Sequence, residues 1–241
     1  MNKRHEQLLF LLLTSSFDLM KCSFYKKLTT IIMFGLVVLL SLLPFYGLCQ
    51  TDWELEEVEG PLKVYTRLKE GTTYLETKVA GKGDADLSAI IAVMQDADNY
   101  TKFMPSCIES SKRNMKGDTI QVHTVITEAP WPVSNREGTY EFKYKYYPDS
   151  NKVIVKFKAI ANSTPTAGCV QVEEAEGYWK FVELNKKEIY VEYVIYANPG
   201  GSIPSWLSNM SVIDLPLGTV IGAFYRTKLP EYKEKKVSFL N

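Results

Sequence analysis

Histidine and cysteine are scarce in this chain of 241 residues, which contains two histidines and four cysteines. Only His123 follows residue 49, and strand alternation places it on the outward, wet face, so it offers no His-based catalytic triad. The same region keeps Cys107 and Cys169, which with one histidine do not complete a structural zinc site. Gly-x-Ser-x-Gly, Walker and dinucleotide-binding motifs are also missing. We therefore predict that the protein is not an enzyme and that it uses no cofactor or metal.

Net charge is absent as well, because 28 basic side chains balance 28 acidic ones. Five of the basic and two of the acidic residues lie in the first 49 residues, so the rest of the chain is slightly acidic. Nucleic-acid-binding proteins present strongly basic faces, so no nucleic acid is expected as a partner. No repeat, low-complexity tract or linker divides residues 50–241, which predicts one domain. Nothing in the sequence defines an oligomeric state.

The N-terminal region contains an uncharged apolar run, Leu28 to Leu48, that follows three lysines. A basic segment, an apolar segment and small residues before a cleavage point form a secretory signal. We expect cleavage before Gln50, because Pro44 and Gly47 favour extended chain there. The run is also long enough to span a bilayer, so an uncleaved membrane anchor is the alternative.

These features assign residues 1–49 to an N-terminal extension and signal peptide, with Met20 as an alternative start, and residues 50–241 to an exported domain. The expected location is the periplasm or the cell exterior. In such an oxidising compartment Cys107 and Cys169 either pair or remain as two buried free thiols.

The pattern of residues 50–241 predicts an α+β fold. A short helical segment at 53–58 precedes a hairpin of strands 62–68 and 74–80, and a helix then begins after Asp84 or Asp86. Five later segments alternate apolar and polar side chains, as in an antiparallel sheet with one wet face: 119–128, 137–147, 153–159, 179–184 and 189–197.

A C-terminal helix is expected from its N-cap Ser205, with a kink or break at Pro216 and Gly218. One helix laid across such a sheet leaves either an apolar cavity or an ordinary aromatic core.

Five short motifs occur in order between Trp53 and about Tyr225. They are Trp53 with Leu62–Arg67 (W…LKVYTR), Met94–Asp96 with Asn99–Tyr100 (MQD…NY), Pro130–Glu137 (PWPVSNRE), Gly177–Phe181 (GYWKF) and Asn198–Asn209 (NPGGSIPSWLSN). Together they resemble the START family, the steroidogenic-acute-regulatory-related lipid transfer domains. The resemblance covers nearly all of the predicted exported domain.

This resemblance implies a helix-grip fold, in which a curved antiparallel sheet wraps around a long C-terminal helix and encloses a hydrophobic tunnel. The helix and the loop 161–168 are implied to form a lid. The implied function is to bind, and to transfer, a single lipid or sterol-like molecule, with transient membrane contact. A helix-grip enzyme of the aromatase/cyclase type is the alternative, with Glu128 and Glu137 as its acid–base candidates.

The ligand-contacting residues expected from the inward strand faces and the resemblance are Thr124, Ile126, Arg136, Phe142, Tyr144, Phe157, Gln171, Tyr193, Trp206, Met210 and Ile213. Steroid-binding relatives resemble one another in an acid and an arginine where Thr124 and Phe142 align, and Gln171 replaces another arginine. The resemblance therefore implies a tunnel with little charge.

Four further residues carry separate expectations. Arg136 should lie at the tunnel mouth, either in an ion pair with a nearby carboxylate or against the polar end of a ligand. Alternation places His123 on the wet face, where it would be inert. Trp131, between two prolines, is expected to anchor a turn, and Trp179 to pack in the core.

Overall fold

The computed structural model describes residues 52–116, 119–160, 164–201 and 203–240. These residues fall within one compact unit, Cys49–Asn241. The expectations for residues 1–49 and for part of the loop 161–168 lie outside them. Within the described ranges, no helix is long and apolar enough to cross a membrane.

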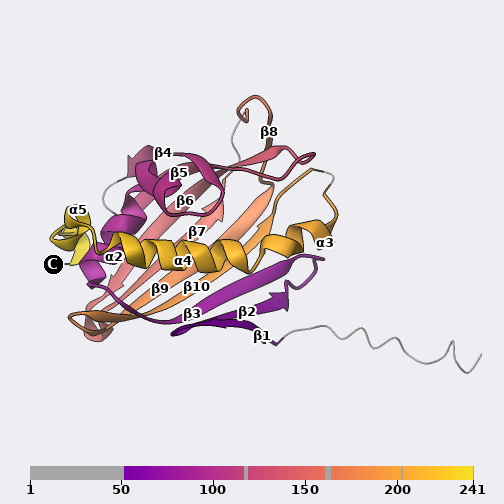
Figure 1. Ribbon diagram of the computed structural model, residues 1–241. Helices are drawn as coiled ribbons and strands as arrows, with labels where there is room; N and C mark the ends of the chain where they lie inside the picture. The colour runs from indigo at the N-terminus through magenta and orange to yellow at the C-terminus, as the bar shows by residue number, and fades with distance from the viewer. Residues whose placement is uncertain (1–51, 117–118, 161–163, 202, 241) are drawn as a thin grey trace, which may run out of the picture. The chain divides into compact units, whose positions relative to one another are not determined.

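A ten-stranded sheet forms the body of this unit (Figure 1). The strand order is β1-β2-β3-β10-β9-β7-β6-β5-β4 with antiparallel neighbours, and β8 pairs with β6 in parallel. The strands are β1 (Glu54–Glu59), β2 (Leu62–Leu68), β3 (Leu75–Asp84), β4 (Cys107–Lys116), β5 (Ile120–Thr127), β6 (Asn135–Tyr147), β7 (Lys152–Ala159), β8 (Cys169–Gln171), β9 (Glu174–Asn185) and β10 (Glu188–Asn198).

One face of the sheet, called the inner face below, carries the longest C-terminal helix, α4, which crosses it in Figure 1. The helical elements are α2 (Leu87–Gln95), η1 (Ala97–Lys102), η2 (Pro148–Ser150), α3 (Ser205–Ser208), η3 (Asn209–Ser211), α4 (Asp214–Arg226), α5 (Pro230–Lys233) and η4 (Ser238–Leu240). Sheet and C-terminal helix thus have the arrangement that the sequence predicted.

The opening segment is a strand and not the expected helix. Residues 54–59 form β1, which pairs with β2 from Glu54 opposite Thr66 to Glu59 opposite Leu62. Gly60, with φ of 55°, makes the tight turn between the two strands. A six-residue helix would be too short to persist alone, whereas β1 gains ladder hydrogen bonds from β2.

Asp86, one of the two expected caps, is the N-cap of α2. Its carboxylate accepts hydrogen bonds from the backbone N–H groups of Ser88 and Ala89 at 2.7 and 3.3 Å. This satisfies two donors that have no partner within the helix. Ile90 and Ile91 of the same helix are buried in the main core.

The C-terminal helix is broken before Pro216 rather than at it, and its first piece begins after Pro204 instead of the predicted cap Ser205. Proline has no N–H group to donate to the carbonyl four residues earlier, which is that of Val212. Thr77 of β3 donates its hydroxyl to this carbonyl at 2.7 Å. A side chain of the sheet therefore satisfies the backbone group at the break.

Gly218 lies inside α4 and does not kink it. A Cβ atom at Gly218 would lie 2.6 Å from Pro105, and one at Gly222 would lie 2.4 Å from the carbonyl oxygen of Phe103. The two glycines lie one helical turn apart, so α4 approaches the segment after η1 closely on this side.

Candidate functional site

The inner face is predominantly aromatic and aliphatic where α4 covers it. Its rings come from four neighbouring strands and pack with Leu217 and Val220 of α4 in one core. The large aromatic members are Phe142, Tyr144, Phe157, Trp179, Phe181 and Tyr193. Trp179 and Tyr193 stack with ring centroids 3.7 Å apart, and Phe142 and Phe157 stack at 5.5 Å. The inward positions predicted for Phe142, Tyr144, Phe157, Tyr193 and Trp179 are confirmed.

Strand β5 faces the opposite way from the prediction. His123 pairs with Tyr140, whereas Thr124 pairs with Thr139 and bonds to its hydroxyl at 3.1 Å, on the outer face. Thr124 and Ile126 are therefore not inner-face residues. Both are 5% exposed while His123 is 0% exposed, so this strand is buried on both faces and alternation could not distinguish them.

His123 is consequently buried on the inner face and is not the solvent-facing residue that was expected. Its Nδ1 lies 3.1 Å from the hydroxyl of Tyr100, and its Nε2 lies 2.9 Å from Oε1 of Gln121. The ring stacks on Phe142 at 4.4 Å. Burial, helped by the positive charge of Lys112, lowers the pKa of His123 to about 3, so the imidazole is neutral.

Two tyrosines extend this polar group to the end of α2. The hydroxyls of Tyr100 and Tyr144 both donate to the carbonyl oxygen of Met94, at 2.5 and 3.0 Å. This carbonyl lies in the last turn of α2, where helix carbonyls lack intrahelical partners. Burial raises the pKa of both phenols, so they remain uncharged.

Arg136 does not form the ion pair that was one of its two expected roles. Its Nε and Nη2 donate to the carbonyls of Pro199 and Gly200, each at 3.3 Å, and its Nη1 donates to that of Ser134. Among the described residues it forms no ion pair, and burial lowers its pKa. Glu137, one expected partner, instead accepts the N–H of Thr166 at 2.6 Å. Arg136 thus joins the start of β6 to the loop that leads into α3.

The remaining predicted contacts lie in β8 and in the C-terminal segment that leads into α4. Gln171 is half-buried in β8, opposite Glu137. Met210 is 70% exposed and therefore points away from the core. Ile213 is partly buried and packs against the main core. Trp206 belongs to α3, and its side chain lies outside the described part of the structure.

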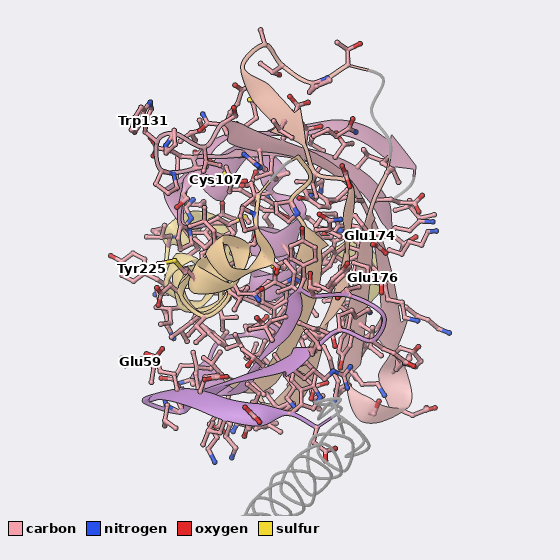
Figure 2. All side chains as sticks on the ribbon, turned by 90° about the vertical axis from the view of Figure 1, so that its right-hand side faces the viewer. Glu59, Cys107, Trp131, Glu174, Glu176 and Tyr225 are labelled. Atoms are coloured by element: carbon pink, nitrogen blue, oxygen red, sulfur yellow. The ribbon has the colours of Figure 1, made fainter. Side chains whose placement is uncertain are left out.

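Trp131 stands clear of the ribbon in Figure 2 and is 93% exposed, so it does not anchor the turn between β5 and β6. The backbone turns at this point, where the N–H of Val133 donates to the carbonyl of Pro130 at 3.0 Å, and the indole projects from the turn into solvent.

The two cysteines are both free. Cys107 pairs with Thr127 of β5, Thr127 with Arg136 of β6, and Arg136 with Val170, next to Cys169. Three strand spacings of about 4.8 Å separate them, roughly 14 Å and well beyond disulfide reach. The alternative of free thiols therefore holds, although Cys169 is only half-buried.

A groove of about 570 Å³ lies on the outer face of the sheet. It is lined by charged side chains, among them the ion pairs of Arg67 with Glu76 at 2.6 Å and of Lys143 with Glu141 at 2.8 Å. No group of three or more potential metal ligands occurs within the described ranges. The inner face is therefore the better candidate for a hydrophobic ligand.

Gln121 and His123 were missed as inner-face residues, and Tyr100 was missed as a partner of His123. Once Phe142 is placed inward, the pairing of β5 with β6 brings Gln121 and His123 to the same face. No sequence pattern supplies that register, since both faces of β5 are buried.

A large antiparallel sheet that holds a C-terminal helix on its inner face defines a helix-grip protein. No family model matches the chain. A solved STAR-related lipid transfer protein from Xanthomonas axonopodis is 32% identical, with a TM-score of 0.67, and the match covers 73% of this chain and 99% of that one. An uncharacterized protein of Pseudomonas aeruginosa is 31% identical over 71% of this chain and 84% of its own length. The phosphatidylcholine transfer protein of Rattus norvegicus is 26% identical over 68% of this chain and 78% of its own. The chain belongs to the STAR-related lipid transfer family.

Proposed function

We propose that this protein binds one lipid molecule between the inner face and α4 and transfers it between membranes. The observation that carries the proposal is the aromatic inner face under α4, with stacked rings such as Trp179 and Tyr193. Burying lipid methylenes against it is worth about 0.8 kcal/mol each, enough for affinity after ordering costs. Family membership and a relative named for lipid transfer support the same role.

The environments of the candidate acid–base residues fit a lipid-binding protein better than an enzyme. His123 is neutral, its Nε2 is hydrogen-bonded to Oε1 of Gln121, and its lowered pKa makes it a poor general base. Glu128 is exposed, and Glu137 is buried and bonded to a backbone N–H. We therefore propose a binding protein, and recovery of chemically altered ligand would favour the aromatase/cyclase alternative.

Transfer needs contact with a membrane, and two exposed apolar side chains are suited to it. Trp131 lies in the β5–β6 turn, and Met210, 70% exposed, lies in η3. Arg136 joins the end of that turn at Ser134 to Gly200, in the loop before α3. The β5–β6 turn and the loop before α3 therefore meet at one end of the inner face. Tryptophan favours the membrane interface. We propose that this end touches the bilayer during transfer.

The location proposed is the periplasm or the cell exterior, after export directed by residues 20–49 or with that segment kept as an anchor. N-terminal sequencing of the secreted protein should find Gln50 or a neighbour.

Native mass spectrometry of the purified protein, followed by solvent extraction, tests the binding proposal. We expect one bound lipid per chain, recovered chemically unchanged. Protein that neither carries a lipid from the cell nor takes one up from vesicles would exclude a carrier.

A further inference from the structure

Two tyrosines of the inner face differ from their neighbours in what their hydroxyls contact. Tyr193 of β10 is 6% exposed, and Tyr140 of β6 is partly buried. Their rings approach Phe157 from two sides, with centroids at 6.2 and 6.4 Å. Neither hydroxyl forms a hydrogen bond to any residue that the structure describes. By contrast, Tyr144 on the same face donates to a helix carbonyl.

The position of the Tyr140 hydroxyl is defined by Gly138. A Cβ atom at Gly138 would lie 2.1 Å from this hydroxyl, so the tyrosine side chain lies over the glycine on the inner face. The hydroxyl of Tyr140 also contributes to the raised pKa of Tyr193, whose first cause is burial, so the two phenols lie near each other. Burial likewise raises the pKa of Tyr140 to about 12. Two uncharged donors that have no hydrogen-bond partner among the described residues therefore share one part of the interior.

The buried carboxylates of the described ranges do not face these two hydroxyls, and the buried cation on their side of β6 is Arg136. The ionised side chains that are buried within the described ranges are Glu76, Glu137, Arg136 and Arg226. Strand alternation places Glu76 and Glu137 on the outer face, next to the inward Thr77 and Arg136 respectively. Arg226 pairs with Glu231 at 3.2 Å, at the C-terminal end of α4. Arg136, at the start of β6, donates to backbone carbonyls only.

We propose that the ligand is a neutral lipid whose hydroxyl or carbonyl oxygen hydrogen-bonds to Tyr140 and Tyr193. The inference rests on the proposed lipid-binding function and names its ligand class. A buried hydroxyl is unfavourable until it finds a partner, and a neutral oxygen supplies one. A phosphocholine head group in the same place would bury an ammonium group that no buried carboxylate of the described residues faces. Its phosphate would gain a counter-charge only if Arg136 left the backbone carbonyls that it now holds, so burial of this head group is more costly. The ligand thus differs from the phospholipid for which the rat relative is named.

Dioleoylglycerol and dioleoylphosphatidylcholine make a matched pair of probes, because they share acyl chains and glycerol and differ in the head group. Uptake of each radiolabelled lipid from vesicles is measured for the full chain and for the double variant Tyr140→Phe, Tyr193→Phe. Tyr146→Phe is the control, since its hydroxyl bonds to Asn151 at the surface end of β6. We expect the unmodified protein to prefer dioleoylglycerol by at least about tenfold and the double variant to lose about tenfold of that uptake. The control should change by less than about twofold.

Equal or better uptake of dioleoylphosphatidylcholine by the unmodified protein would overturn the neutral-ligand inference and leave lipid binding intact. Unchanged dioleoylglycerol uptake by the double variant would overturn the roles of the two hydroxyls. Uptake of neither lipid by the unmodified protein would refute the proposed function itself. If the double variant melts early, the two single variants carry the test, and each should lose about threefold.

Discussion

Substituting His123 tests the buried polar group on the inner face through its effect on stability against pH. In the folded protein its pKa is lowered from 6.5 to about 3, first by burial and then by the charge of Lys112. The unfolded chain therefore binds a proton that the folded protein excludes. Stability is expected to be complete above pH 6.5 and to fall as the pH drops from 6.5 towards 3.

The magnitude follows from the size of this shift. One pKa unit corresponds to about 1.4 kcal/mol, so the full window contributes about 5 kcal/mol. At about pH 5 the loss should be about 2 kcal/mol relative to about pH 7.5. Other groups that titrate in the range contribute equally to the protein and to a variant that lacks only the imidazole.

Urea unfolding of the protein and of His123→Gln, at about pH 7.5 and about pH 5, measures the difference. The substitution removes the titrating imidazole, while the amide of glutamine can still form hydrogen bonds with Tyr100 and Gln121. We expect the variant to be less stable than the unmodified protein at both pH values. The unmodified protein should lose about 2 kcal/mol more than the variant on acidification. Parallel losses in the two proteins would show that His123 titrates as an exposed histidine, and the buried network would then be wrong.

Two further predictions concern the break in the C-terminal helix and the exposed tryptophan. Thr77→Val removes the donor to the Val212 carbonyl; we expect it to cost about 1–3 kcal/mol of unfolding free energy in urea and to speed lipid release. Unchanged stability and release would show that this bond does not hold the break. Trp131→Ser should slow lipid transfer between vesicles severalfold while leaving the bound lipid in native mass spectra, because only membrane contact is removed. Leu55→Ser, an exposed position on β1, is its control, and equal slowing in both would contradict a specific contact at Trp131.

Strands with one solvent-exposed face could be predicted from the sequence, whereas strands without a clear alternation of apolar and polar residues could not. Lys145 and Lys156 lie on the polar sides of β6 and β7, and such alternation marks both strands and their inward aromatic residues. The segment 54–59 has acidic residues on both sides, so no period identifies it, and only pairing with β2 makes it a strand. β8 has three residues, too few for a pattern.

The helix break had a different origin. Proline at position 216 predicts a discontinuity, but the break falls before it because the freed carbonyl of Val212 finds Thr77, which is 135 residues away in the sequence. Likewise, Gly218 alone suggests a position where the helix is easily broken. In the structure it lets α4 pack closely against Pro105. Contacts with residues distant in the sequence determine both the position of the helix break and the role of Gly218, and the residues next to them in the sequence do not reveal such contacts.

The candidate site shows how a correct fold can carry an incorrect register. Aligning the family motifs placed Thr124 inward beside Phe142, yet a shift of one residue along a strand moves every side chain to the opposite face. The observed pairing puts Gln121 opposite Phe142 and His123 opposite Tyr140. The polar groups of the inner face differ from the lone threonine hydroxyl that was expected: they are a neutral imidazole, an amide, phenols and, at the start of β6, the guanidinium of Arg136. The neutral ligand that we propose would therefore be selected by residues that differ from those the resemblance suggested.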